Sequence, residues 1–379
     1  MLKMLFTTNI PAPYTADFFD SLSQYINLTV IFERRTAKNR EDTWLGKESN
    51  KYKSVFLKGI NVGEEAAFCP GIIDFLKRPF DVIIIGDYSS PTGILAINYL
   101  NFHHIKYAIH IDGGIVGAKS GLRYDIKKHL MKGASSYFSP GEVSDKYLRV
   151  YGNANIPIYH YPFTSIREKD VLHSLVSKKE KERIREELGM TKKCDICAVS
   201  VGSIIHRKGY DILINALGYV SANIDVYIVG GNATQELTNQ MKMNNVQNVH
   251  FIHFKDHDVA LKYMKCADLF ILPTRYDIWG LVINEALAMG LPVITTDMCV
   301  AGLELVKNGK NGFIVPAENI ELLGKAIDEY DGLSEEQKTC FSNESLKRAQ
   351  QYTIEKMAKK YACNVNEFAT QLKQRSSDE

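Results

Sequence analysis

Short apolar runs alternate with amphipathic stretches along the chain of 379 residues. The strand-like runs before residue 165 are KMLFTT, NLTVIFE, DVIIIG, KYAIHID, SSYFSP and IPIYHYP. The intervening stretches have helical spacing, as at Phe18, Phe19 and Leu22 after the first run. This alternation predicts an α/β fold in which parallel strands are covered by helices on both faces.

A polar segment divides the chain into two parts. Residues 166–189 carry mixed charges, apolar residues at helical spacing and a glycine at the end. After it, strand-like runs resume with CDICAVSV, IDVYIVGG, NVHFIHF, ADLFILP and LPVITT. A chain of this length is usual for two domains. We therefore predict domains over 1–165 and 190–353, joined by a linker and first helix over 166–189.

The stretch 267–296 contains the clearest strand, loop, helix and strand pattern. ADLFILP reads as a buried strand, residues 274–279 as a loop, and 280–289 as a helix that Gly290 and Pro292 end. Loops at the carboxyl ends of parallel strands gather ligands, and the first turn of a helix offers unpaired N–H groups to an anion.

Two carboxylates in this stretch can face one ligand. Asp277 lies in the loop and Glu285 about one turn inside the helix. A phosphate could bind the N–H groups of Gly280 and Leu281, while the carboxylates accept hydrogen bonds from hydroxyls, as a nucleotide sugar requires. The alternative is that Glu285 is a solvated helix residue and Asp277 a turn former.

The motif D-x-W-G-L-x-x-x-E-A-L-A-x-G-x-P-V-I (277–294) resembles the donor-site signature of retaining glycosyltransferase family 4, a group 1 glycosyl transferase family with the GT-B fold. The resemblance implies two Rossmann-like domains facing across a cleft. It also implies that Asp277 holds hydroxyls of the donor sugar, that Glu285 holds the ribose, and that the backbone between them, from Trp279 to Leu281, binds the diphosphate. The family usually has Glu at the first acidic position, so this carboxylate is shorter by one methylene.

A second element, from Gly202 to Ala216, resembles the family's G-R-…-K-G-x-x-x-L-I-x-A motif, whose Arg and Lys bind the donor diphosphate. Lys208 matches the lysine. Ser203 stands where the arginine is usual, and Arg207 is the candidate to supply the missing charge. The alternative for both cations is an ordinary surface position.

The first half offers candidates at the carboxyl ends of two strands. The strand KYAIHID presents His110 and Asp112, and two glycines then allow a tight turn. Relatives carry a histidine near the donor sugar, and either residue can take this catalytic position; the alternative is a buried structural histidine and a turn-forming aspartate. For the acceptor, Asn9, Pro13 and Tyr14 in the first loop are the candidates, although a proline-containing turn needs no ligand.

Residues 119–132 carry a basic amphipathic pattern. Leu122, Ile126 and Leu130 form an apolar stripe at i, i+4 and i+8, flanked by five cations. A helix that lies on an anionic membrane has this pattern, and so does a core-facing helix with a solvated basic side. Since the family often uses lipid-linked acceptors, we predict peripheral membrane contact here.

Composition narrows the remaining choices. The net charge of +2 does not indicate nucleic-acid binding. The start MLKMLFTTNI is too short for a signal peptide, no apolar run approaches a membrane span, and the single C-x-x-C pair, 194–197, lacks the second pair of a zinc site. These features favour a cytoplasmic protein with reduced thiols, peripheral on the inner face of the plasma membrane.

The resemblance implies transfer, with retention, of a hexose or N-acetylhexosamine from a UDP-linked donor to a hydroxyl of a lipid-linked or growing saccharide. It also implies a last helix, 354–374, that returns to the first domain. No D-x-D motif sits at a fitting strand end, so we predict no metal, and no cofactor besides the nucleotide sugar as co-substrate. The alternatives are a sugar-nucleotide epimerase of the same architecture, and a non-catalytic binding subunit, which the departures at Asp277 and Ser203 would suit.

Overall fold

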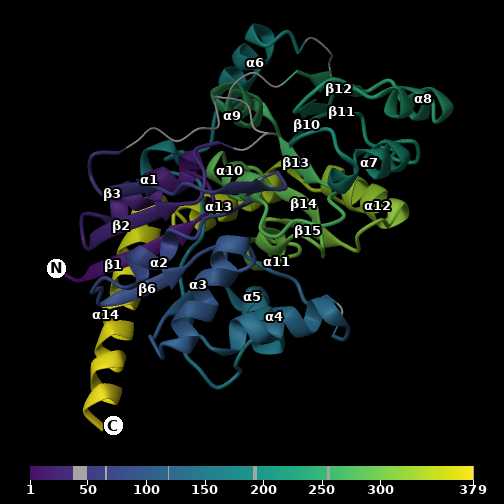
Figure 1. Cartoon of the computed structure of the whole chain (residues 1–379). Helices are drawn as coiled ribbons and strands as arrows, with labels where there is room; N and C mark the ends of the chain where they lie inside the picture. The colour runs from purple at the N-terminus through teal and green to yellow at the C-terminus, as the bar shows by residue number, and fades with distance from the viewer. Residues whose placement is uncertain (37–48, 65, 118, 191–193, 254–256, 379) are drawn as a thin grey trace. The chain divides into compact units, whose positions relative to one another are not determined.

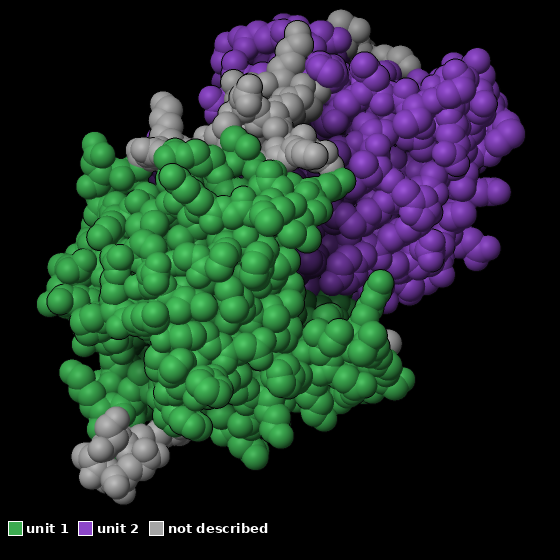
Figure 2. Space-filling view, viewed as in Figure 1, with its two compact units in different colours: residues 1–165, 353–379 green, residues 166–352 purple. Residues whose placement is uncertain are grey.

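The computed structural model describes residues 1–36, 49–64, 66–117, 119–190, 194–253 and 257–378. It divides into two compact units, coloured in Figure 2. Unit 1 comprises Met1–Ser165 and Thr353–Glu379, and unit 2 comprises Ile166–Tyr352. The polar segment 166–189 is therefore part of unit 2, and the last helix is part of unit 1.

Unit 1 contains a seven-stranded sheet in which every strand pair is parallel. Its order is β3-β2-β1-β6-β7-β8-β9. The strands are β1 Lys3–Thr8, β2 Asn27–Phe32, β3 Lys53–Phe56, β6 Val82–Ile85, β7 Ala108–His110, β8 Ser136–Ser139 and β9 Ile158–His160. A separate antiparallel hairpin, β4 Ile60–Val62 with β5 Ala66–Phe68, and the strand β3 were not predicted from the sequence.

Helices cover both faces of this sheet (Figure 1). They are α1 Pro13–Leu22, α2 Ile72–Leu76, α3 Pro91–Phe102, α4 Leu122–Lys132, α5 Glu142–Tyr151 and α14 Ile354–Asp378. Successive residues of β1 point to opposite faces of the sheet. Leu5 belongs to the core shared with α2 to α5 on one face, whereas Phe6 contacts Phe19 of α1 on the other. The long helix α14 packs against α1 on that second face.

Unit 2 contains a six-stranded parallel sheet of order β12-β11-β10-β13-β14-β15. The strands are β10 Ile196–Val201, β11 Ile224–Val229, β12 Val249–Ile252, β13 Leu269–Leu272, β14 Val293–Thr296 and β15 Gly312–Val315. The helices are α6 Lys178–Glu187, α7 Tyr210–Leu217, α8 Gln235–Met243, α9 His257–Cys266, α10 Leu281–Ala288, α11 Val300–Leu305, α12 Ile320–Asp331 and α13 Glu335–Ala349. Two 3-10 turns, η2 Glu168–Asp170 and η3 His206–Lys208, complete it.

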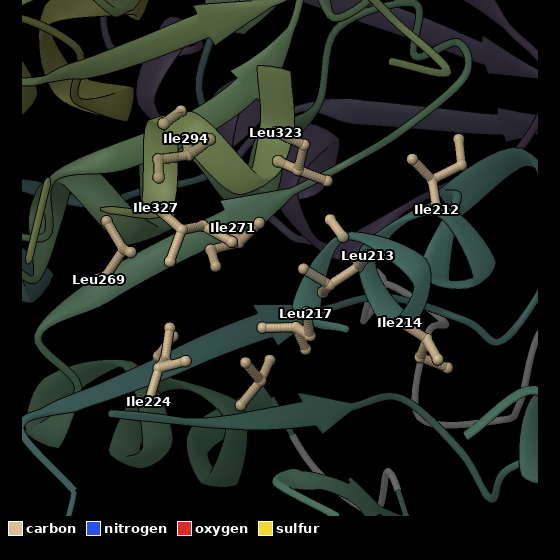
Figure 3. Packing of buried hydrophobic residues seen from close by; sticks show 14 of the residues in the cluster. Ile212, Leu213, Ile214, Leu217, Ile224, Leu269, Ile271, Ile294, Leu323 and Ile327 are labelled. Atoms are coloured by element: carbon tan, nitrogen blue, oxygen red, sulfur yellow. The ribbon is translucent and has the colours of Figure 1, made fainter. Parts of the chain in front are cut away.

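The core of unit 2 lies between one sheet face and the helices α7 and α12 (Figure 3). Leu269 and Ile271, two positions apart on β13, contact this core together with Leu213 and Ile327. Every second strand residue faces the same side, so the alternate residues face the helices on the other side. The parallel sheets confirm the predicted α/β class, and β13, α10 and β14 confirm the strand, helix and strand order of 267–296.

Among the helices of the described residues, none is long and apolar enough to cross a membrane.

Candidate functional site

The N-terminus of α10 is shaped by a glycine that no other residue can replace. Gly280 is the N-cap and has φ of 100°. A Cβ there would lie 2.7 Å from the sulfur of Cys299. The backbone therefore enters α10 in a left-handed conformation, and the first turn of the helix begins after the loop that follows β13 without a side-chain N-cap.

Lys208 contacts Asp277 beside this helix end. Its ammonium nitrogen lies 2.7 Å from Asp277 Oδ2, and Lys208 is only 8% exposed. A left-handed Gly209, at which a Cβ would lie 2.0 Å from the carbonyl oxygen of Pro273, lets η3 pack directly on the loop after β13. This close approach brings a lysine and an aspartate that are far apart in the sequence into one ion pair.

Arg207 supplies a second cation to the same carboxylate. Its Nη1 lies 3.1 Å from Asp277 Oδ2 and donates to the carbonyl oxygen of Tyr276 at 2.9 Å. Ser203, at the position where an arginine was expected, is exposed and its carbonyl oxygen accepts from Ile205 N. The direction of Arg207, which the sequence left open, is therefore toward Asp277.

Arg275 fixes the loop that carries Asp277, and sequence reasoning missed it. Its guanidinium makes two hydrogen bonds to Asp211, at 2.8 and 2.6 Å, and a third to Glu318 at 2.9 Å. Burial acts to raise the pKa of the Asp211 carboxyl, but the hydrogen bond and charge of Arg275 lower it below its usual range. The backbone N–H of Arg275 also donates to the carbonyl oxygen of Arg207 at 2.8 Å. The loop is thus held to η3 by a backbone hydrogen bond and to α7 by the ion pair of Arg275 with Asp211.

Glu285 faces the start of α9. It is 7% exposed, and its Oε1 lies 3.3 Å from His257 Nε2. The hydrogen bond with Glu285 raises the pKa of His257 above its usual value. His257 was not predicted, because nothing in the local sequence connects it with α10.

Trp279 has a buried side chain, whereas the predicted donor site uses its backbone. Its indole is 3% exposed and donates from Nε1 to Asn284 Oδ1 at 2.8 Å. The ring is therefore a buried part of the α10 packing and presents no surface to a ligand. Its carbonyl oxygen accepts from Ala301 N at 2.8 Å, which ties the loop to α11.

Unit 1 brings its two predicted catalytic residues into contact. His110 Nε2 lies 2.8 Å from Asp112 Oδ1. The histidine is 6% exposed, whereas the aspartate side chain is 43% exposed. Asp112 is thus the group that faces solvent, and His110 lies behind it. The hydroxyls of Tyr161 and Tyr361, which were not predicted, both lie 3.2 Å from nitrogens of the imidazole.

A small cavity of about 30 Å³ opens beside Asp112. Its lining residues come from β1, α1 and the ends of β6 and β7, together with 163 and 357: they are Phe6, Thr8, Tyr14, Thr15, Phe18, Phe19, Gly86, His110, Asp112, Phe163 and Met357. The rings of Tyr14 and Phe163 meet edge to face with centroids 6.0 Å apart. A volume of about 30 Å³ has room for one or two water molecules, so the cavity is too small to enclose a sugar ring.

The other two acceptor candidates have local roles. Asn9 Oδ1 accepts from Ile10 N at 2.7 Å, which is a turn contact. Pro13 is exposed and is the first residue of α1, where its missing N–H costs no hydrogen bond. Of the three, only Tyr14 lines the cavity.

The helix α4 is only partly packed. Leu130 is buried at 3% exposure, but Leu122 and Ile126 of the same stripe are 76% and 46% exposed. Lys127 turns inward over the rings of Tyr147 and Tyr151. The exposed cations of the segment are Lys119, Arg123, Lys128 and Lys132. Of the three residues in the apolar stripe, an ordinary core-facing helix therefore explains only Leu130, which is buried.

Comparison with known proteins shows which part of the chain resembles a described family. Residues 180–346, less than half of the chain, match the family described as Glycosyl transferases group 1. An uncharacterized glycosyltransferase of Methanocaldococcus jannaschii is 31% identical over 144 residues, which are 38% of this chain and 40% of that protein. The poly(glycerol-phosphate) alpha-glucosyltransferase of Bacillus subtilis is 28% identical over 172 residues, 45% of this chain and 24% of that protein. The matches thus span well under half the length of these relatives.

Solved structures resemble the chain over nearly its full length. Sucrose-phosphate synthase from Thermosynechococcus elongatus superimposes with a TM-score of 0.75 at 15% identity and covers 99% of this chain and 100% of that chain. Anabaena Alr3699/HepE in complex with UDP and glucose gives 0.71 at 16% identity, with coverage of 97% and 100%. At these identities the likeness establishes the fold, which is that of GT-B glycosyltransferases.

Proposed function

We propose that the protein transfers a sugar from a nucleotide sugar to a hydroxyl group of a saccharide acceptor. The observation that carries the proposal is the convergence of Lys208 and Arg207 with Asp277 at the N-terminus of α10, one turn before Glu285. These groups lie within the segment that matches the group 1 glycosyl transferases.

Each group has a chemical task in this proposal. Lys208, Arg207 and the N–H groups of Gly280 and Leu281 bind the diphosphate and stabilise it as it leaves. Glu285 accepts hydrogen bonds from the ribose hydroxyls. Asp277 accepts from a hydroxyl of the donor sugar through Oδ1, to which the described residues donate no hydrogen bond.

The finer features follow from the same set of groups. Fixed cations and helix-end N–H groups can neutralise the departing diphosphate, so we propose that no divalent metal is needed. We propose a hexose or N-acetylhexosamine as the sugar, UDP as its carrier, and retention of anomeric configuration as in glycosyltransferase family 4. The UDP and glucose bound by the similar Alr3699/HepE support that choice of donor.

Unit 1 supplies the acceptor groups in this proposal. Asp112 is the catalytic residue beside the reacting sugar, and Tyr14, which lines the small cavity next to it, contacts the acceptor. Leu122 and Ile126, exposed among four cations, would contact an anionic membrane and bring the enzyme to a lipid-linked acceptor at the inner face of the plasma membrane.

The test is turnover of UDP-, GDP- and ADP-sugars by the purified protein, with mass spectrometry of products on a panel of polyprenyl-linked and free saccharides. Formation of a glycoside with release of nucleoside diphosphate supports transfer, and NMR of its anomeric proton reports retention. An epimerised sugar nucleotide would identify an epimerase instead. Binding without turnover, measured as a thermal shift, would identify a non-catalytic subunit.

A further inference from the structure

A buried tyrosine of the last helix reaches the imidazole behind Asp112. Tyr361 lies on α14 and is fully buried, and its phenol oxygen is 3.2 Å from His110 Nδ1. Its ring is packed between Phe138 and Phe18, with centroids 4.6 and 5.2 Å away. This packing holds the hydroxyl toward a histidine that is 251 positions earlier in the chain.

The hydrogen bonds of Tyr161 determine which nitrogen of His110 carries the proton. The Tyr161 hydroxyl donates to the carbonyl oxygen of Ile111 at 2.7 Å. A phenol has one proton, so the same oxygen, 3.2 Å from His110 Nε2, can only accept there. Asp112 Oδ1, 2.8 Å from Nε2, is a second acceptor. With two acceptors in front of it, Nε2 carries the hydrogen.

The other nitrogen then faces a donor. Burial, and after it the charge of Asp112, raises the pKa of Tyr361 well above its usual value, so the phenol keeps its proton. Within the described part of the chain, His110 Nδ1 is the one hydrogen-bond partner of that hydroxyl. Tyr361 therefore donates its hydroxyl proton to Nδ1. The protons on Tyr361, on Tyr161 and on His110 Nε2 then all have an acceptor.

We propose that Tyr361 is a positioning residue that fixes the ring orientation of His110 by donating to Nδ1, so that the Nε2–H group is directed at the carboxylate of Asp112. Tyr361 donates to Nδ1, and Nε2–H donates to Asp112 Oδ1. Asp112 Oδ2, to which the described residues donate no hydrogen bond, stays available for a substrate hydroxyl. The catalytic consequence rests on the proposed function, in which Asp112 contacts the reacting sugar.

The orientation of the Asp112 side chain depends on this hydrogen bond, because Asp112 is the exposed residue in the series Tyr361, His110 and Asp112. A side chain that is 43% exposed can adopt several rotamers, and one directed hydrogen bond selects one of them. Nε2 keeps both of its acceptors when the phenol is removed, so the Nε2–H tautomer remains, but Nδ1 loses its donor and the ring loses one of the contacts that fix its orientation. A purely structural tyrosine would affect stability and leave the turnover number unchanged.

The experiment compares Tyr361→Phe with Tyr107→Phe. Tyr107 is a matched control because it is equally buried in unit 1 and donates to Asn101, away from the site. Nitrogen NMR of ¹⁵N-histidine-labelled protein, with the His110 signals assigned from His110→Gln, reads the tautomer. Steady-state kinetics with the active sugar nucleotide read turnover. Thermal unfolding measures the stability of each variant.

We expect wild-type protein and Tyr107→Phe to show a protonated Nε2 and an unprotonated Nδ1. In Tyr361→Phe we expect Nε2 to stay protonated, the Nδ1 signal to shift because that nitrogen has lost its hydrogen-bond donor, kcat to decrease about three- to tenfold, and the donor KM to stay within about twofold of wild type. A protonated Nδ1 in the wild type, or an unchanged Nδ1 signal and kcat in Tyr361→Phe, would overturn the proposal. If the wild type transfers no sugar, the proposed function fails, and the Nδ1 signal alone decides whether Tyr361 donates to His110.

Discussion

The ammonium nitrogen of Lys208 lies 2.7 Å from Asp277 Oδ2. Both side chains are largely buried, so each charge depends on the other for the stabilisation that water would provide. A nucleoside diphosphate would bring a second anion to Lys208 and Arg207, and the described residues donate no hydrogen bond to Asp277 Oδ1. The ion pair thus preorganises one cation for phosphate and one carboxylate for sugar.

Lys208→Met and Glu285→Gln should distinguish an interaction that stabilises the transition state from one that binds the donor throughout the reaction. Loss of a hydrogen bond to a charged group costs about 1.5–3 kcal/mol, so each variant should lose at least tenfold in kcat/KM for the donor. We expect the lysine variant to lower kcat, because the leaving diphosphate carries its charge in the transition state, and the glutamate variant mainly to raise KM. The control is Lys310→Met, at an exposed position of unit 2. Unchanged kinetics in both site variants would mean that the donor binds elsewhere.

Removal of divalent metals should leave the transfer rate nearly intact. The described residues contain no group of three or more metal-ligating side chains that could hold an ion, and Lys208, Arg207 and the start of α10 supply positive charge. The measurement is the initial rate after dialysis against EDTA, with and without added Mg²⁺ or Mn²⁺. A rate that disappears on chelation and returns with metal would assign the diphosphate charge to an ion instead.

The sequence predicted the parallel strands and the helix α10 because their signals are local. Asp277, Glu285 and Lys208 could be selected as candidates for the same reason, since each stands in a short motif. Their partners could not be predicted, because they meet only in the folded chain: Arg275 and Asp211 are 64 positions apart, and Tyr361 and His110 are 251.

Glu33 should make stability depend on pH. It is 5% exposed; its Oε2 accepts from Ala67 N at 3.0 Å and its Oε1 from the Ser90 hydroxyl. Burial raises its pKa from 4.5 to about 7. Below pH 4.5 Glu33 is protonated in both the folded and the unfolded chain. Between pH 4.5 and about 7 the unfolded chain releases this proton while the folded chain keeps it, so the free energy of unfolding decreases as the pH rises, and the loss is complete above the folded pKa.

Glu33→Gln removes the titration and keeps an acceptor for the N–H group. We expect the melting temperature of the variant, relative to wild type, to increase between about pH 5 and about pH 8. The control is Glu236→Gln, at an exposed position of α8, which should show no such trend. A difference that stays constant over this range would show that Glu33 does not carry the effect.

Exposed residues of α4 should control binding to anionic vesicles. Leu122→Ser with Ile126→Ser removes the two exposed apolar side chains, and we expect at least a tenfold loss of partitioning into phosphatidylglycerol vesicles. Arg123→Gln with Lys128→Gln should weaken the same binding by about 1 kcal/mol per charge. Met243→Ser is the control, since Met243 is 79% exposed in unit 2. Equal binding of wild type to neutral phosphatidylcholine vesicles would argue against this surface.

Asp277 is one of two positions at which the chain departs from the motifs of the family it resembles, and two variants test what its shorter carboxylate does. Asp277→Glu keeps the charge but lengthens the side chain by one methylene. In the wild type the carboxylate oxygen Oδ2 lies 2.7 Å from Lys208 and 3.1 Å from Arg207, so the longer side chain must shift its carboxylate relative to both cations. If the pocket is fitted to this enzyme's own donor, kcat/KM should fall, because the carboxylate can no longer hold both the cations and the sugar.

Asp277→Asn keeps the shape and removes the charge. It leaves Lys208, which is 8% exposed, without its anion, so we expect weaker transfer together with tighter binding of free nucleoside diphosphate, whose phosphates would replace the carboxylate as partner. Isothermal titration with the diphosphate and initial rates with the sugar nucleotide measure the two effects separately. Lower rates in both variants, with diphosphate affinity retained or raised, would support sugar recognition by Asp277. Unchanged transfer in both would remove Asp277 from the site.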